Sequence, residues 1–149
     1  MFDLGGYLPY LINRAGVRLA VAFGRELKPH GVVVQEWRVL AALAAHGAQR
    51  LSDLAALTSI DLSTLSRLVG RMVRGGLVAR GRVDPGRMGG DRREVRVRLT
   101  ARGRQTTRGI IPMARHYEKV ALAGFSSAEA RTLKRQLIRL YSNLDRLSR

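Results

Sequence analysis

The segment from Ile60 to Arg74 constrains the fold more than any other part of the chain. At about 100° per residue, its side chains separate into an apolar face and a polar face. The apolar face consists of Leu62, Leu65, Leu68, Val69, Met72 and Val73, and the polar face of Ser63, Thr64, Ser66, Arg67, Gly70, Arg71 and Arg74. We expect a helix whose apolar positions all lie in the core. Its polar face has no acid, and its short hydroxyls and arginines are suited to base edges and phosphates in a DNA groove.

The charge balance favours a polyanionic partner. The 149 residues include 27 Lys and Arg but only 11 Asp and Glu, a formal net charge of +16. Such an excess is typical of proteins that bind nucleic acid or an acidic membrane surface, although an arginine-rich soluble protein without such a partner is the simpler interpretation. The sequence has no cysteine, which excludes disulfides and thiolate chemistry and fits a cytoplasmic location. The longest apolar run, 39–45, is too short to span a bilayer.

The order of predicted elements indicates a mainly α-helical fold with a small β-hairpin. Apolar spacing predicts helices over about 3–28, 35–46, 52–58 and 61–74, with Asp61 as the N-cap of the fourth. Short strands follow at 77–82 and 94–99. The second alternates Val95, Val97 and Leu99, which we expect to form a buried face, with charged residues on the other face. A glycine-rich loop, 83–93, joins them. Helix resumes after Thr100 and ends near Gly124, and Ser126 with Glu129 forms a capping box for a last helix.

Three helices followed by a two-stranded hairpin make a winged helix-turn-helix. We expect this DNA-binding module at 35–99 of a single domain, 1–149, with dimerisation helices at 1–34 and 100–149. Its predicted DNA contacts lie on the basic helix and at the tip of the hairpin, where Asp91 can hold the Arg93 guanidinium by a two-point contact. They are Ser63, Thr64, Ser66, Arg67, Arg71 and Arg74 on the helix, and Arg87, Asp91, Arg92 and Arg93 at the tip.

The last predicted helix carries leucines at alternating steps of four and three, the spacing of a heptad seam. One small module offers this seam no partner, so we expect it to pack against a second copy of the chain together with the first helix. The predicted homodimer interface comprises Leu8, Leu11, Leu133, Leu137, Leu140, Leu144 and Leu147.

Two strings of residues carry a family resemblance. The first is L-S-D-L-A-A-L-T-S-I-D-L-S-T-L-S-R-L-V-G-R-M-V-R-G-G-L-V-A-R, and the second is D-R-R-E-V-R-V-R-L-T-A-R-G. With them, the whole chain resembles the MarR family of bacterial transcription regulators. The resemblance implies that Ser63, Thr64, Ser66 and Arg67 are recognition-helix contacts and that Asp91 and Arg93 form the wing-tip pair. The chain departs from the family at Gly70, where an acid usually braces an arginine, and in a longer wing loop.

The resemblance also implies a ligand site where the long first helix meets the winged module, and small aromatic acids that relieve repression. Aromatic and thioether groups can hold a ring while an arginine pairs with a carboxylate. Hydrophobic packing is the alternative role for the aromatic residues. The expected lining is Tyr7, Tyr10, Arg14, Arg18, Trp37, Arg38, Met113 and His116.

The sequence therefore predicts a homodimeric, sequence-specific DNA-binding transcriptional regulator, a repressor relieved by a small aromatic carboxylate. The alternatives are a sequence-tolerant architectural or nucleic-acid-coating protein and a basic membrane-surface protein. No nucleophile-base set, phosphate loop or carboxylate pair is found, so we expect no enzymatic activity. The three histidines lack metal-ligand spacing, and we expect neither a metal nor a cofactor.

Overall fold

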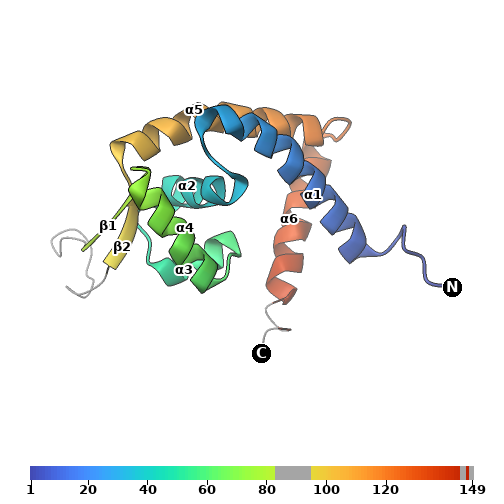
Figure 1. Cartoon of the computed structure of the whole chain (residues 1–149). Helices are drawn as coiled ribbons and strands as arrows, with labels where there is room; N and C mark the ends of the chain where they lie inside the picture. The colour runs from blue at the N-terminus through green and yellow to red at the C-terminus, as the bar shows by residue number, and fades with distance from the viewer. Residues whose placement is uncertain (83–94, 145–146, 148–149) are drawn as a thin grey trace. The chain divides into compact units, whose positions relative to one another are not determined.

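A computed structural model describes residues 1–82, 95–144 and 147 of the chain (Figure 1). These residues divide into two compact units, Met1–Ala114 and Arg115–Arg149. The first unit holds α1 (Leu8–Leu27), the short 3-10 helix η1 (Lys28–His30), α2 (Val34–His46), α3 (Leu51–Thr58), α4 (Leu62–Arg74), β1 (Val78–Arg82), β2 (Val95–Leu99) and the start of α5 (Ala101–Ala121). The second unit holds the end of α5 and α6 (Ser127–Leu144). The predicted mainly helical fold with a small hairpin is confirmed.

The first helix begins later than predicted. It starts at Leu8 rather than near residue 3, because Pro9 is tolerated only in a first helical turn. Before it, Gly5 and Gly6 lie in a turn, and the Gly5 amide donates to the Asp3 carboxylate at 2.9 Å. At its other end the helix continues into η1, which Gly31 closes with a left-handed φ of 64°. The predicted end of the first helix near residue 28 is therefore confirmed.

The core of the first unit is built around α4. Leu65, Leu68, Val69 and Met72 are buried against neighbouring elements, which include α3, β1 and α2. The prediction that the whole apolar face is core is wrong at both ends, because Leu62 is 52% exposed and Val73 is 37% exposed. Leu62 occupies the first position of the helix, and Val73 lies in its last turn. Helical spacing predicts the direction in which each side chain points. The side chain is buried only where a neighbouring element also covers that part of the helix.

The hairpin pairs β1 with β2 antiparallel, from Val78 opposite Leu99 to Arg82 opposite Val95. Val97 is buried and also exchanges two backbone hydrogen bonds with Gln49, at 3.0 and 2.8 Å, which fixes the chain before α3 to the sheet. Val95 was expected to be buried but is 53% exposed, because it pairs at the end of the hairpin farthest from the core.

A close contact fixes the start of α5 against the start of the hairpin. The Thr100 hydroxyl donates to the Gly76 carbonyl at 2.6 Å and accepts from the Gly103 amide at 2.9 Å. A Cβ atom at Gly103 would lie 1.9 Å from the Leu77 carbonyl oxygen, so only glycine fits there. These contacts give the L-T-x-x-G segment, residues 99–103, a packing role.

The second unit contains the predicted capping box. The Ser126 amide donates to the Glu129 carboxylate at 2.7 Å, and the Glu129 amide donates to the Ser126 hydroxyl at 3.2 Å. These hydrogen bonds lower the pKa of Glu129. Lys134 of α6 forms an ion pair with Glu118 of α5. Among its described residues α6 has none that is buried, and Leu137, Ile138, Tyr141 and Leu144 are exposed.

Candidate nucleic-acid interface

The first turn of α4 is held by the Asp61 side chain. Its Oδ1 atom accepts from the Thr64 amide at 2.9 Å and from the Ser63 hydroxyl at 2.7 Å. Hydrogen bonds from the hydroxyl and the amide of Thr64, together with that of Ser63, lower the pKa of Asp61 from 3.8 to about 2. The carboxylate is therefore ionised at neutral pH, and the predicted N-cap is confirmed. Because the Ser63 hydroxyl donates its proton to Asp61, its oxygen can only accept from a further partner, which suits the amino group of a base.

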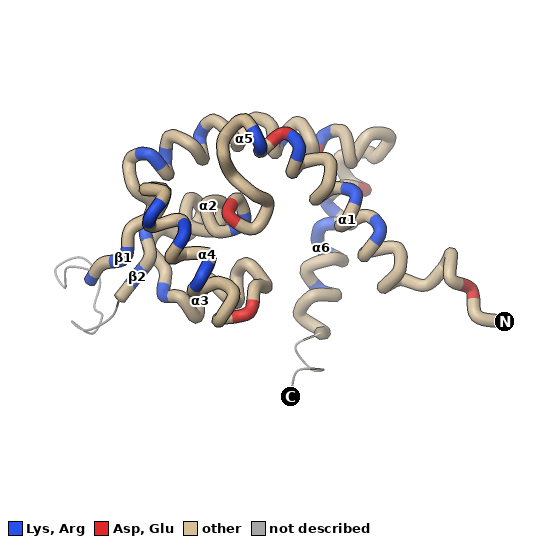
Figure 2. Tube along the Cα trace, viewed as in Figure 1, with Lys and Arg blue, Asp and Glu red and all other residues tan. Residues whose placement is uncertain are grey.

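The outer face of α4 is basic. Arg67, Arg71 and Arg74 are exposed at steps of four and three, so they share one side of the helix. From Leu62 to Arg82 the sequence contains no acid. Figure 2 shows Lys and Arg on α4, on both strands and at the start of α5. This face carries hydroxyls at the helix N-terminus and guanidinium groups along its length, which is the chemistry that base edges and phosphates require.

Two further residues shape this face, and sequence reasoning missed the first. The Arg80 guanidinium of β1 donates to the Ser66 carbonyl of α4 at 3.1 Å, linking the hairpin to the helix. Only the alternation of the strand, which points Arg80 the same way as the buried Val78, could have suggested it. Gly70 is the position at which the family usually has an acid that braces an arginine. The space beside Gly70 is open, because a Cβ there would meet only the Arg74 guanidinium, at 3.8 Å.

The predicted wing-tip residues Arg87, Asp91, Arg92 and Arg93 lie outside the described residues. Their roles stay predictions. The strands that carry this loop are described, and Arg82 is exposed where β1 ends.

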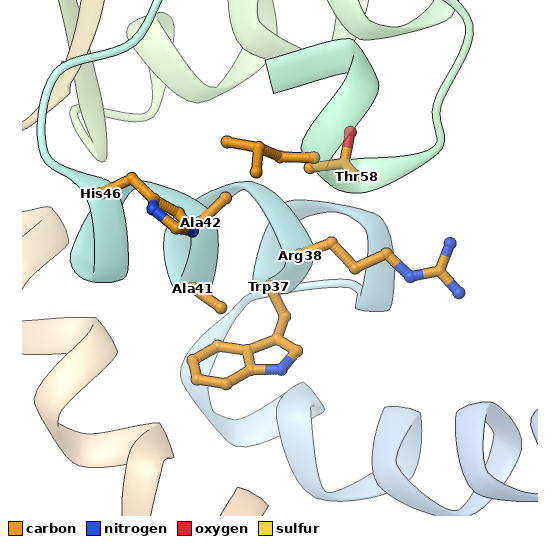
Figure 3. A pocket seen from close by; sticks show the side chains of 7 residues that line it. Trp37, Arg38, Ala41, Ala42, His46 and Thr58 are labelled. Atoms are coloured by element: carbon orange, nitrogen blue, oxygen red, sulfur yellow. The ribbon is translucent and has the colours of Figure 1, made fainter. Parts of the chain in front are cut away.

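The predicted ligand residues are only partly brought together. Trp37 and Arg38 line a hollow of about 380 Å³ between α2 and α3 (Figure 3). The other lining residues are Ala41, Ala42, His46, Leu57 and Thr58. Figure 3 shows the Arg38 guanidinium pointing away from both the Trp37 ring and His46. Sequence reasoning missed His46, although Arg38, Ala42 and His46 follow one another at four-residue steps on one helical stripe.

The other predicted ligand residues do not line this hollow. Arg14 lies over the Tyr10 ring, 5.3 Å from its centroid, within α1. Trp37 packs edge-on against Phe23, with ring centroids 5.9 Å apart, so its indole also serves the packing of α1 on α2. Tyr7, Arg18 and Met113 belong to the first unit, and His116 belongs to the second. Whether these residues bind a ligand stays a prediction.

Comparison with known proteins places the chain in a family. Residues 30–87 match the family model described as the MarR family. A transcriptional regulator of the MarR family from Silicibacter pomeroyi has a similar structure, with a TM-score of 0.81 and 30% sequence identity over 95% of this chain and 92% of that one. The chain belongs to the MarR family. The predicted resemblance is thus confirmed.

Two other similar proteins carry functional descriptions. The HTH-type transcriptional repressor IacR of Pseudomonas putida is 29% identical over 138 residues, which cover 93% of this chain and 80% of IacR. The structure of Bordetella bronchiseptica BpsR concerns the regulation of its DNA binding by 6-hydroxynicotinic acid. BpsR matches with a TM-score of 0.74 and 30% identity, over 91% of this chain and 98% of that one.

In the part of the chain that the structure describes, no three His, Cys, Asp or Glu side chains gather as metal ligands. Over the same residues, no helix is both long and apolar enough to traverse a bilayer.

Proposed function

We propose that this MarR-family protein is a sequence-specific DNA-binding transcriptional repressor that acts as a homodimer in the cytoplasm and has no enzymatic activity. The observation that carries the proposal is the outer face of α4, which is held by its own N-cap. There Ser63 and three arginines are exposed, Thr64 and Ser66 are half-buried, and the face has no acid. The repressor description of IacR and the regulated DNA binding of BpsR support the same activity for this chain.

In this proposal affinity and specificity come from different residues. Arg71, Arg74 and the basic residues of the strands neutralise phosphates, a contribution that falls steeply with salt. Ser63, Thr64, Ser66 and Arg67 discriminate between bases in the major groove. Of the wing-tip residues, Arg87, Arg92 and Arg93 contact phosphates or a narrow minor groove, with Asp91 orienting Arg93.

The homodimer follows from apolar surface that one chain leaves uncovered. In the first unit Leu8 and Leu11 of α1 are exposed, and in the second Leu137, Leu144 and Leu147 are exposed while Leu133 and Leu140 are half-buried. Large apolar side chains in such numbers mark an interface. Two winged modules related by a two-fold axis would read a pseudo-palindromic operator.

We further propose that a small aromatic carboxylate relieves repression. The hollow is lined by the rings of Trp37 and His46, and Arg38 lies on the same helix with its guanidinium directed away from them. The predicted set Tyr7, Tyr10, Arg14, Arg18, Met113 and His116 extends the candidate lining. The carboxylate must prefer the DNA-incompetent state, because equal affinity for both states shifts nothing. Thermal unfolding with 6-hydroxynicotinic acid and with its neutral amide tests this step. We expect the acid alone to raise Tm, and Arg14→Ala, Arg18→Ala or Arg38→Ala to identify which guanidinium pairs with it.

The decisive experiment is a salt titration of DNA binding by fluorescence anisotropy. An operator duplex is first selected from random sequence and then compared with a scrambled duplex of equal length. A sequence-specific regulator should prefer the operator by about 10³-fold or more at physiological salt. Equal affinity for both duplexes would instead identify a sequence-tolerant architectural protein, and anionic vesicles that compete with the operator would identify a membrane-surface protein.

A further inference from the structure

A second hollow lies on the other side of α2, apart from the hollow that Trp37 lines. Its volume is about 450 Å³, and it is formed where the end of α2 and the turn after it meet β2 and the first half of α5. All of its lining residues belong to the first unit. None of them belongs to the predicted ligand set, and apart from Arg98 of β2 none is among the residues assigned to DNA contacts. The volume is within the range of small-molecule sites.

The walls of this hollow combine an apolar floor with three cations. Leu43, Leu99 and Ile111 are the large apolar residues of the lining, and Arg98, Arg104 and Arg108 supply the charge. The sequence has no acid between Val95 and Tyr117. Among the residues that the structure describes, none of these three arginines forms an ion pair. Figure 2 shows this run of basic residues on β2 and at the start of α5.

The polar groups of the hollow are partly oriented by the fold. The Arg104 guanidinium donates to the Leu99 carbonyl at 3.1 Å, which holds it at the edge of β2. An arginine has five N–H donors, so several remain for a ligand. The Thr107 hydroxyl donates to the Gly103 carbonyl at 2.7 Å and so has no proton left to give. Any donor to a ligand must therefore come mainly from the arginines.

We infer that this cleft, which we call the α2–β2–α5 cleft, binds an organic anion with an apolar body. A carboxylate or a phosphate monoester would accept two-point hydrogen bonds from the guanidinium groups and reduce the repulsion among them. The apolar part of the ligand would cover Leu43, Leu99 and Ile111. Because α5 continues past the cleft into the second unit, the anion would bind the helix that joins the two units. The cleft is a ligand site separate from the proposed effector site.

Isothermal titration of the full-length protein tests the cleft without reference to DNA. The probes are naphthalene-2-carboxylate, 2-naphthyl phosphate and the neutral naphthalene-2-carboxamide. We expect saturable binding of at least one of the two anions, with the tighter one identifying the preferred charged group, and no binding of the amide. Arg98→Gln and Arg108→Gln should each raise the dissociation constant of the anion by about tenfold or more.

Arg102→Gln is the matched control for Arg108→Gln. Arg102 is also exposed on α5 and loses the same charge, but it does not line the cleft. The anion should therefore bind this variant as it binds the unaltered protein. Circular dichroism confirms that each variant is folded.

Three results would overturn the inference. They are the absence of saturable binding by both anions, equal binding of the amide, and equal weakening by Arg102→Gln and Arg108→Gln. Loss of binding in Arg38→Gln with full binding in Arg108→Gln would place the anion in the hollow between α2 and α3. That result supports the proposed effector site and rejects this cleft, so the two proposals fail separately.

Discussion

The helices α4 and α6 are both amphipathic, yet they bury their apolar faces to very different degrees. In α4 the central positions Leu65, Leu68 and Met72 are covered by the rest of their own unit. In α6 no described residue is buried, and Leu137 and Tyr141 stand in solvent. An apolar stripe in a sequence thus predicts that one face of a helix will be covered. It does not predict whether the same chain or another chain covers that face. The α4 face is covered within its own unit, whereas the proposed homodimer would cover the α6 face with a second copy.

The largest effect should come from the buried face of α4. Leu68 is fully buried, so Leu68→Ala leaves a cavity and should lower the free energy of unfolding by about 2–5 kcal/mol. Leu62→Ala on the same helix is the matched control and should cost less than about 1 kcal/mol, because that side chain is 52% exposed. Urea denaturation at one fixed protein concentration measures both. Equal losses would mean that Leu62 is also covered, by a second chain.

The second prediction concerns the α6 face. Leu140→Asp places a charge on the proposed seam and should raise the dissociation constant of the dimer by about 100-fold or more. Operator binding should fall with it. Gln136→Asp introduces the same charge at an exposed polar position of α6 and should leave the dimer intact. Sedimentation velocity at micromolar concentration gives the result, and a Leu140→Asp variant that still sediments as a dimer contradicts the assignment of the seam.

The third prediction concerns the outer face of α4. Arg67→Ala should lower the preference for operator over scrambled duplex by about 1–3 kcal/mol, the value of one base contact. Arg131→Ala on α6 removes the same charge from an exposed position of the other helix and should leave that preference unchanged. Fluorescence anisotropy at constant salt compares the two. If both variants lose only non-specific affinity, Arg67 contacts phosphate rather than a base.

The smallest effect should come from the N-cap of α4. The pKa of Asp61 is about 2 in the folded chain and 3.8 without its hydrogen bonds. A lowered pKa stabilises the fold above pH 3.8, and that stabilisation is lost as the pH falls toward 2. Asp61→Asn keeps an acceptor for the cap but cannot titrate, so its stability should fall less between pH 5 and pH 2. Parallel slopes for the two proteins in pH-dependent urea denaturation would show that Asp61 is not hydrogen-bonded as described.

Local features were predicted from the sequence best. The Asp61 cap and the Ser126–Glu129 capping box depend on residues three apart, so a short string contains the whole interaction. Exposure at Leu62, Val73 and Val95 was not predicted, because periodicity specifies a face and not the extent of the neighbour that covers it.

Contacts between segments that are distant in the sequence could not be predicted either. The hydrogen bond from Arg80 to Ser66 and the three-arginine cleft depend on how strands and helices pack. Leu57 of α3 lines the hollow between α2 and α3 and is 46% exposed. The pattern and spacing of apolar residues do not predict which surfaces stay exposed after the elements have packed together.

The junction at Thr100 and Gly103 limits the sequence changes that this protein can tolerate. It joins the residue before β1 to the residue after β2, so this end of the hairpin is held by contacts that do not involve the loop between the strands. Each doubling of a flexible loop costs only about 0.6 kcal/mol of closure entropy. Insertions between residues 82 and 95 should thus be inexpensive in stability, whereas any side chain at Gly103 is not. Evolution and protein engineering can lengthen the wing freely while that single glycine stays fixed.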